Sequence, residues 1–165
     1  MHVDSHAHLD DSDFDADRAA VIERARTAGL RYLLAVGGGT GPDNLDAPVA
    51  LAERHDWIYA TVGIHPHDAR HFAEHHAERI RKLAQHPKVV GIGEIGLDYY
   101  RDRSPREIQK RVLVRQLELA REARLPLLFI AATRGPSSRR LSRPTGNRAG
   151  WAASCIASRA PAKMP

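Results

Sequence analysis

The sequence predicts an α/β protein with a largely parallel β-sheet. Over roughly the first 130 residues, short runs rich in β-branched residues alternate with longer stretches of helical hydrophobic spacing. The 165-residue chain is 42% hydrophobic and can build a packed core, which excludes disordered and collagen-like classes. Its apolar runs are too short to span a membrane, and its N-terminus has no basic segment followed by an apolar one. We therefore expect a cytoplasmic protein.

Five short runs have the length and composition of β-strands. Most end at glycine, proline or polar residues, as is typical of chains in which strands and helices alternate. In chain order, the predicted strands cover residues 2–6, 32–37, 58–65, 89–98 and 127–132.

The stretches between these runs place apolar residues along one side of a helix. In chain order, the predicted helices cover residues 15–28, 43–55, 73–85 and 104–124. Gly29 follows the first helix at the place where a left-handed residue often ends one. The fourth helix has the clearest start, with Ser104 as N-cap, Pro105 at the first position and Glu107 three residues after the cap. Its predicted buried stripe is Ile108, Val112, Leu113, Leu117 and Ala120.

A His-x-His pair lies at the end of the first predicted strand. His6 and His8 are two residues apart, so both imidazoles project from one face and can chelate one divalent cation. In parallel α/β barrels this end of the strands forms the active-site face. The alternative is an ordinary surface pair. Because Cys155 is the only cysteine, any metal would be held by His, Asp and Glu.

A carboxylate lies within the fourth predicted strand, and further histidines lie at the end of the third. Glu94 lies within an apolar, glycine-rich run, where burial of a carboxylate requires a cation, either a metal ion or an arginine. The glycines around it indicate a close approach of backbone or ligand. His65 and His67 follow the third strand, where they can bind metal, donate to a phosphate, or lie in a solvated loop. Residues 37–41 are glycine-rich but lack a P-loop pattern, so we expect a flexible turn.

The basic charge is confined to one part of the chain. The net charge is +5, yet residues 131–165 alone hold six Arg and one Lys and no acidic residue, so the first 130 residues are slightly acidic. Periodicity also stops after residue 132, and we predict that residues 131–165 form a disordered basic tail. Such a tail either has no partner or contacts nucleic-acid phosphates.

Three motifs resemble those of the TatD-type metal-dependent hydrolases. They are Asp-Ser-His-Ala-His-Leu-Asp at residues 4–10, Gly-Ile-His-Pro-His at 63–67, and Gly-Glu-Ile-Gly-Leu-Asp-Tyr at 93–99. The resemblance implies a (β/α)8 barrel of the TIM type, related to the amidohydrolases, and hydrolysis of DNA phosphodiester bonds by cation-activated water. It implies His6 and His8 as ligands of one metal ion, Glu94 as a catalytic carboxylate shared between two ions, and His65 as a substrate-binding residue. Mg, Mn and Zn all suit such ligands.

The resemblance ends near Leu128. The family's later site residues, two histidines and an aspartate, have no counterpart, because no histidine follows His86 and no Asp or Glu follows Glu122. A complete barrel usually needs about 250 residues. We therefore predict residues 1–130 to be the N-terminal part of a barrel, truncated by a loss of reading frame near Leu128. Exposed barrel edges would favour self-association. The alternatives to an enzyme are an inactive fragment and a basic-tailed module that binds nucleic acid without catalysis.

Overall fold

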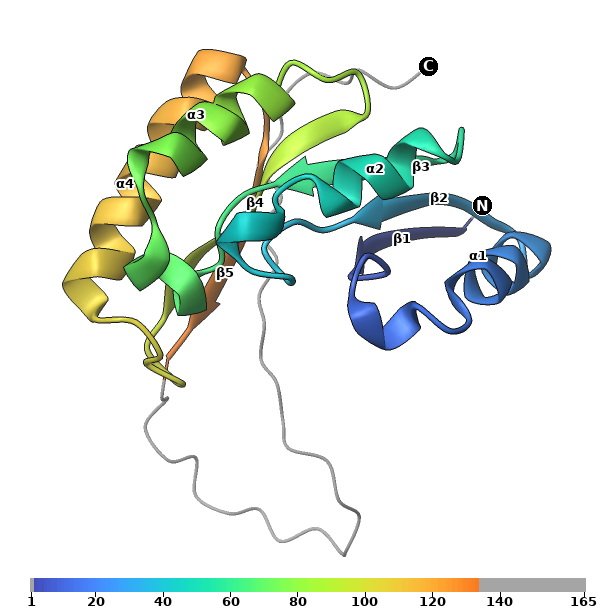
Figure 1. The fold of residues 1–165 in the computed structure, drawn as a ribbon, viewed down its shortest axis with the longest axis horizontal. Helices are drawn as coiled ribbons and strands as arrows, with labels where there is room; N and C mark the ends of the chain where they lie inside the picture. Colours follow the sequence, from blue (N-terminus) through green and yellow to red (C-terminus); the bar gives the residue numbers. More distant parts are fainter. Residues whose placement is uncertain (1, 134–165) are drawn as a thin grey trace, which may run out of the picture.

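The computed structural model describes residues 2–133 and shows five strands joined by helices (Figure 1). The strands are β1 (His2–Ala7), β2 (Leu30–Ala35), β3 (Ile58–Val62), β4 (Val89–Asp98) and β5 (Leu127–Ala132). The α-helices are α1 (Arg18–Thr27), α2 (Ala47–Glu53), α3 (Glu74–Leu83) and α4 (Arg106–Ala123). Three short 3-10 helices are η1 (Ser12–Phe14), η2 (Pro42–Asn44) and η3 (Pro66–His71). The basic tail predicted from the sequence lies, from residue 134 onward, outside the described residues.

The sheet is parallel throughout, and its strand order is the order of the sequence, β1-β2-β3-β4-β5. Each connection carries a helix, and α4 packs on β4 and beside α3 (Figure 1). This confirms the predicted α/β class and the partial (β/α) barrel of about five strands and four helices. Parallel strands in sequential order bring their carboxyl ends to one edge, so the loops after β1, β3 and β4 lie together.

The core lies between the sheet and the helices that cover it. Its largest fully buried apolar side chains are Ile58, Ile64, Ile80, Ile92, Ile95 and Leu119. Two glycines let β4 approach β5 closely: a Cβ at Gly93 would lie 2.5 Å from Cβ of Leu128, and one at Gly96 would lie 1.9 Å from the carbonyl oxygen of Ile130. The close approach expected from the glycine-rich run is therefore one of backbone against backbone.

Two predictions about the fourth helix were wrong. The helix begins at Arg106, and Ser104 does not cap it, because its hydroxyl bonds η3 instead. In the predicted apolar stripe, Leu117 is 37% exposed, whereas Gln109 and Gln116 on the same helix are each only 1% exposed. These two amides bond main-chain groups beside the sheet, which offsets the cost of burying them.

The third strand is shorter than predicted, ending at Val62 rather than at residue 65. The main chain of Ile64 bonds the side chain of Gln116 in place of a neighbouring strand, with its N–H donating to Oε1 at 2.7 Å and its C=O accepting from Nε2 at 3.0 Å.

Within residues 2–133, no helix is both long enough and apolar enough to cross a bilayer. The cytoplasmic location stays a prediction.

Candidate metal centre

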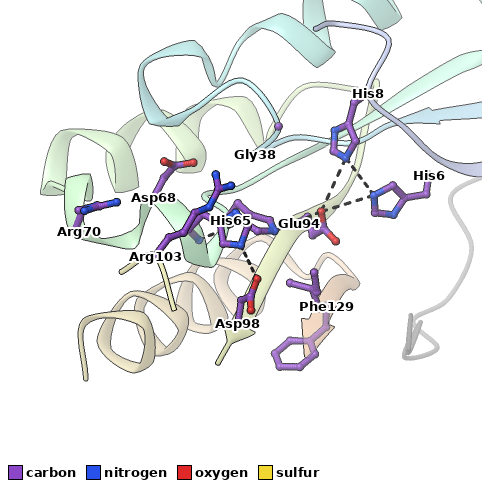
Figure 2. A pocket seen from close by; sticks show the side chains of 13 residues that line it. His6, His8, Gly38, His65, Asp68, Arg70, Glu94, Asp98, Arg103 and Phe129 are labelled. Atoms are coloured by element: carbon purple, nitrogen blue, oxygen red, sulfur yellow. Dashed lines mark hydrogen bonds and ion pairs between the residues drawn. The ribbon is translucent and has the colours of Figure 1, made fainter. Parts of the chain in front are cut away.

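Three of the side chains selected from the sequence converge at the carboxyl edge of the sheet. His6 comes from the end of β1, His8 from the residues just after it, and Glu94 from the middle of β4 (Figure 2). Nε2 of His6 lies 3.2 Å from Nε2 of His8 and 3.6 Å from Oε2 of Glu94. Nε2 of His8 lies 4.0 Å from the same Oε2.

These separations fit a shared divalent cation. An imidazole or carboxylate ligand sits about 2.0–2.2 Å from an ion such as Zn²⁺, so two ligands of one ion are at most about 4.4 Å apart. All three distances, 3.2, 3.6 and 4.0 Å, fall below that limit. The group is also the one cluster within residues 2–133 whose donor atoms lie mutually within 4.8 Å.

The orientation of His8 also suits a ligand. Its Nδ1 lies 3.1 Å from the carbonyl oxygen of Val36, which can only accept, so Nδ1 carries the proton and Nε2 presents a lone pair to the cluster. Metal-binding histidines commonly have their second nitrogen bonded to a backbone carbonyl in this way. Gly39 leaves room for the ring, because a Cβ there would lie 2.6 Å from Nδ1 of His8.

Glu94 is a buried carboxylate without a basic partner. It is 8% exposed, and its backbone N–H donates to the carbonyl oxygen of Gly37 at 2.7 Å. Its ion-pair contacts within 4 Å are imidazoles, with no arginine or lysine among the described residues. Burial raises the pKa of Glu94, and the nearby His8 and His67 only partly oppose this. The sequence predicted either a metal ion or an arginine beside Glu94. Among the described residues no arginine pairs with it.

His65 lies at the same cluster but has the opposite tautomer to His8. Its Nδ1 accepts the N–H of His67 at 3.1 Å, so the neutral ring carries its proton on Nε2, which is 4.0 Å from Oε2 of Glu94. Burial, with help from neighbouring His67, lowers the pKa of His65 to about 3. A neutral ring with Nε2–H facing the cavity can donate a hydrogen bond to a bound oxygen.

Sequence reasoning gave His67 no definite role and Asp98 none, yet the two form the tightest pair in the pocket. Nε2 of His67 lies 2.5 Å from Oδ2 of Asp98, and Oδ1 accepts the N–H groups of Tyr100 and Arg101 at 2.9 Å. Burial raises the pKa of Asp98, but these backbone donors and His67 outweigh it and hold the pKa below its ordinary value. The sequence offered one signal for this residue: Asp98 is a second acid at the end of the predicted strand, four residues after Glu94.

Gln109 holds the loop after β4 in place. Its Oε1 accepts the N–H of Asp98 at 2.8 Å, while its Nε2 donates to the carbonyl oxygens of Ser104 at 2.7 Å and Asp98 at 3.2 Å. The seven-residue spacing between Gln109 and Gln116 was the signal available in the sequence, since residues at i and i+7 share a helix face.

The histidines described above, Glu94 and Asp98 border one cavity of about 600 Å³ (Figure 2). One end carries the cluster of His6, His8 and Glu94, and His65 lies in the middle (Figure 2), with the ring centroid of His67 4.2 Å from its own. The remaining lining residues are Gly38, Gly39, Asp68, Arg70, Asp98, Arg103, Phe129 and Ile130. A cavity with a candidate cation site at one end and polar donors along it suits an anionic ligand.

Comparison with known proteins identifies a family whose sequences match most of this chain. A family model described as "TatD related DNase" matches residues 3–129. An uncharacterized metal-dependent hydrolase, YabD, from Bacillus subtilis is 41% identical over 129 residues, covering 78% of this chain and 50% of that protein. A protein named 3'-5' ssDNA/RNA exonuclease TatD from Rahnella sp. is 39% identical over 137 residues, covering 83% of this chain and 52% of that protein.

Solved structures show the same fold. The crystal structure of YJJV, a TatD homologue from Escherichia coli, superposes with a TM-score of 0.68 at 31% identity, covering 78% of this chain and 49% of that one. A TatD family hydrolase from Entamoeba histolytica gives a TM-score of 0.69 at 24% identity. The chain spans about half the length of the relatives it matches, in keeping with a partial barrel.

Proposed function

The chain belongs to the TatD related DNase family, and from that premise we propose that its cavity hydrolyses phosphodiester bonds of nucleic acid with the help of divalent cations. The observation that carries the proposal is the set of three donor atoms from His6, His8 and Glu94, spaced for one shared ion. Relatives named as a metal-dependent hydrolase and as an exonuclease support it.

In this mechanism His6 and His8 would hold one cation, and Glu94 would be the catalytic carboxylate shared between that cation and a second one. A bound divalent cation supplies Lewis-acid polarisation of a phosphoryl oxygen and activation of water. The buried position of Glu94 keeps its carboxylate free of competing arginine or lysine partners. Mg, Mn and Zn are the cations to test.

His65 binds the substrate. Its neutral imidazole directs the Nε2 proton toward the cavity, so it can donate to a non-bridging phosphate oxygen. A neutral donor does not repel cations held at His6 and His8, which a protonated imidazole would. The substrate we propose is DNA or RNA in single-stranded form, because the name of the Rahnella relative specifies that substrate.

Metal uptake and DNA cleavage by the purified chain test the proposal together. Replacing Glu94 with Ala removes one donor of three and the only negative charge among them. We therefore expect lost cleavage and metal affinity at least about tenfold weaker, as measured by chelator competition and by cleavage of end-labelled single-stranded DNA. Glu107→Ala, an exposed change on α4, is the matched control.

Unchanged metal content in Glu94→Ala would contradict the assigned role. Metal binding without turnover in the unmodified chain would support the inactive-fragment alternative, and DNA binding without metal uptake would support the basic-tailed module. The names of the relatives favour the hydrolase over both alternatives.

A further inference from the structure

Two arginines border the cavity at the end opposite the metal centre. Arg70 belongs to η3, and Arg103 belongs to the loop between β4 and α4. Figure 2 shows both, together with Asp68, on the far side of His65 from His6 and His8. The cavity therefore has a cation-binding end and an end that carries positive side chains.

Within the part of the chain that the structure describes, the guanidinium groups of these two arginines form no ion pair with an acidic residue. Six other arginines of the described residues do pair with a carboxylate, among them Arg18 with Asp15 and Arg106 with Asp102. Across residues 2–133, neither Arg70 nor Arg103 has a carboxylate oxygen within 4 Å. Both side chains are exposed, so their charge is available to a ligand in the cavity.

The backbones that carry the two arginines are joined by one buried hydroxyl. Oγ of Ser104 accepts the N–H of Arg70 at 3.1 Å and donates to the carbonyl oxygen of His67 at 2.6 Å. Ser104 is 1% exposed, and its own carbonyl accepts from Gln109 at 2.7 Å. The backbone next to Arg103 is thus fixed to that of Arg70 before any ligand arrives, so a two-arginine contact orders only the side chains.

We propose that Arg70 and Arg103 bind the phosphate next to the one being hydrolysed. This rests on the proposed function, which places the reacting phosphodiester at His6, His8 and Glu94. The forked guanidinium matches phosphate oxygens in pairs, and a nucleic-acid strand presents its phosphates at regular intervals. A strand that passes His65 therefore brings its next phosphate to the arginine end. The substrate class is accordingly an oligonucleotide with at least two phosphates, not a mononucleotide ester.

Asp68 adds a negative charge near the two arginines, so phosphate binding can be either weakened or strengthened by substitution. It lines the cavity beside the two arginines (Figure 2), and it lies two positions before Arg70 in the same 3-10 helix. Its carboxylate repels a bound phosphate. Removing an arginine should therefore weaken binding, whereas Asp68→Asn should strengthen it.

The test measures binding of a short, fluorescein-labelled oligothymidylate to the full chain in EDTA, where no cleavage occurs. We expect Arg70→Gln and Arg103→Gln each to weaken binding about tenfold, since a charge-assisted contact to phosphate is lost. Each change should also lower the slope of log affinity against log salt by about 0.7. The matched control is Arg111→Gln, which removes the same charge from the exposed face of α4. The basic tail is present in every variant, so it cancels from each comparison.

A modified probe locates the contact. With one internal phosphate replaced by an uncharged methylphosphonate at the contacted position, Arg103→Gln should cost little further affinity, because the pair is already broken. Binding of Arg70→Gln and Arg103→Gln equal to that of the unmodified chain would overturn the proposal. So would an equal loss in Arg111→Gln, or an unmodified chain that does not bind the probe.

Metal uptake of the same variants separates this subsite from the metal centre. Arg103→Gln should take up metal normally and still bind the probe weakly. If the unmodified chain takes up no metal but Arg103→Gln loses affinity, the metal-dependent function fails and the phosphate subsite stands. If the unmodified chain takes up metal and both arginine variants bind the probe as tightly as it does, the phosphate subsite fails and the metal-dependent function stands.

Discussion

At the scale of single residues, main-chain hydrogen bonds give two histidines of the cavity the tautomers that their proposed roles require. The Nδ1–H of His8 donates a hydrogen bond to the carbonyl oxygen of Val36, so the Nε2 lone pair is free to bind a metal ion. His65 accepts a backbone N–H at Nδ1, which leaves the Nε2 proton for a substrate oxygen. Because an imidazole has only these two nitrogens, a single backbone contact decides whether each ring is a ligand or a donor.

Gly39 should be required for metal binding although it cannot bind metal itself. A methyl group at this position would lie 2.6 Å from Nδ1 of His8, well inside contact distance. We expect Gly39→Ala to displace the ring from the Val36 carbonyl and to weaken metal affinity by about tenfold, the lower range for loss of a supporting contact. Chelator competition measures this. Asn44→Ala is the control for this region, since Asn44 is exposed in the neighbouring η2, and equal losses in both variants would contradict the explanation.

Asp98 should stabilise the fold in a pH-dependent way. Its pKa in the folded chain lies below the ordinary value, so the ionised form contributes stability above about pH 3.9, the unfolded value, and loses it as the pH falls through the folded pKa. Asp98→Asn should lower the unfolding free energy at pH 7 by about 1–3 kcal/mol, with a smaller difference near pH 3. Urea denaturation at the two pH values checks this, with exposed Asp56→Asn as the control. A difference that grows in acid would contradict it.

At the scale of elements, one helix positions the loops that carry the site. From α4, Gln116 bonds the main chain of Ile64, directly before His65, and Gln109 bonds that of Asp98. Ile64 follows the end of β3 and Asp98 is the last residue of β4, so both lie where strand pairing ends. A buried amide, which donates and accepts at once, satisfies their backbone groups where an aliphatic side chain would not.

Replacing Gln116 with Leu should be costly despite the similar size of the two side chains. The change leaves the N–H and C=O of Ile64 buried without partners, so we expect a loss of about 1–3 kcal/mol in unfolding free energy. Urea denaturation measures this, and exposed Gln85→Leu is the control. Stability equal to that of the unmodified chain would show that water or a backbone shift replaces the amide.

The order of elements could be predicted because it depends on hydrophobic spacing, which is local. The histidine pair at residues 6 and 8 was expected at the carboxyl edge of the sheet, and the structure places it there beside Glu94, since parallel topology brings strand ends together. Ser104 was assigned to the wrong partner, because a hydroxyl beside proline fits a helix cap and a tertiary bond equally well. The pairing of His67 with Asp98 joins residues 31 positions apart, a separation that no local pattern encodes.

At the scale of the whole molecule, the described sheet is open. Among residues 2–133, β1 and β5 each pair with one strand, and the residues of β1 are exposed or half-buried. A strand edge with free N–H and C=O groups is a template for pairing with another chain. The motif residues nevertheless converge, because the strands that position His6, His65 and Glu94 all lie within this part of the barrel.

Self-association through β1 is the last prediction. Val3 is 51% exposed on this edge strand, where apolar surface favours pairing and a charged side chain opposes it. We expect the unmodified chain to gain mass with concentration in light scattering, and Val3→Lys to stay closer to the monomer mass. Val114→Lys is the matched control, since Val114 is 55% exposed on α4, away from the edge. Equal behaviour of the two variants would place the contact elsewhere, and a monomeric unmodified chain at all concentrations would show that the β1 edge does not pair.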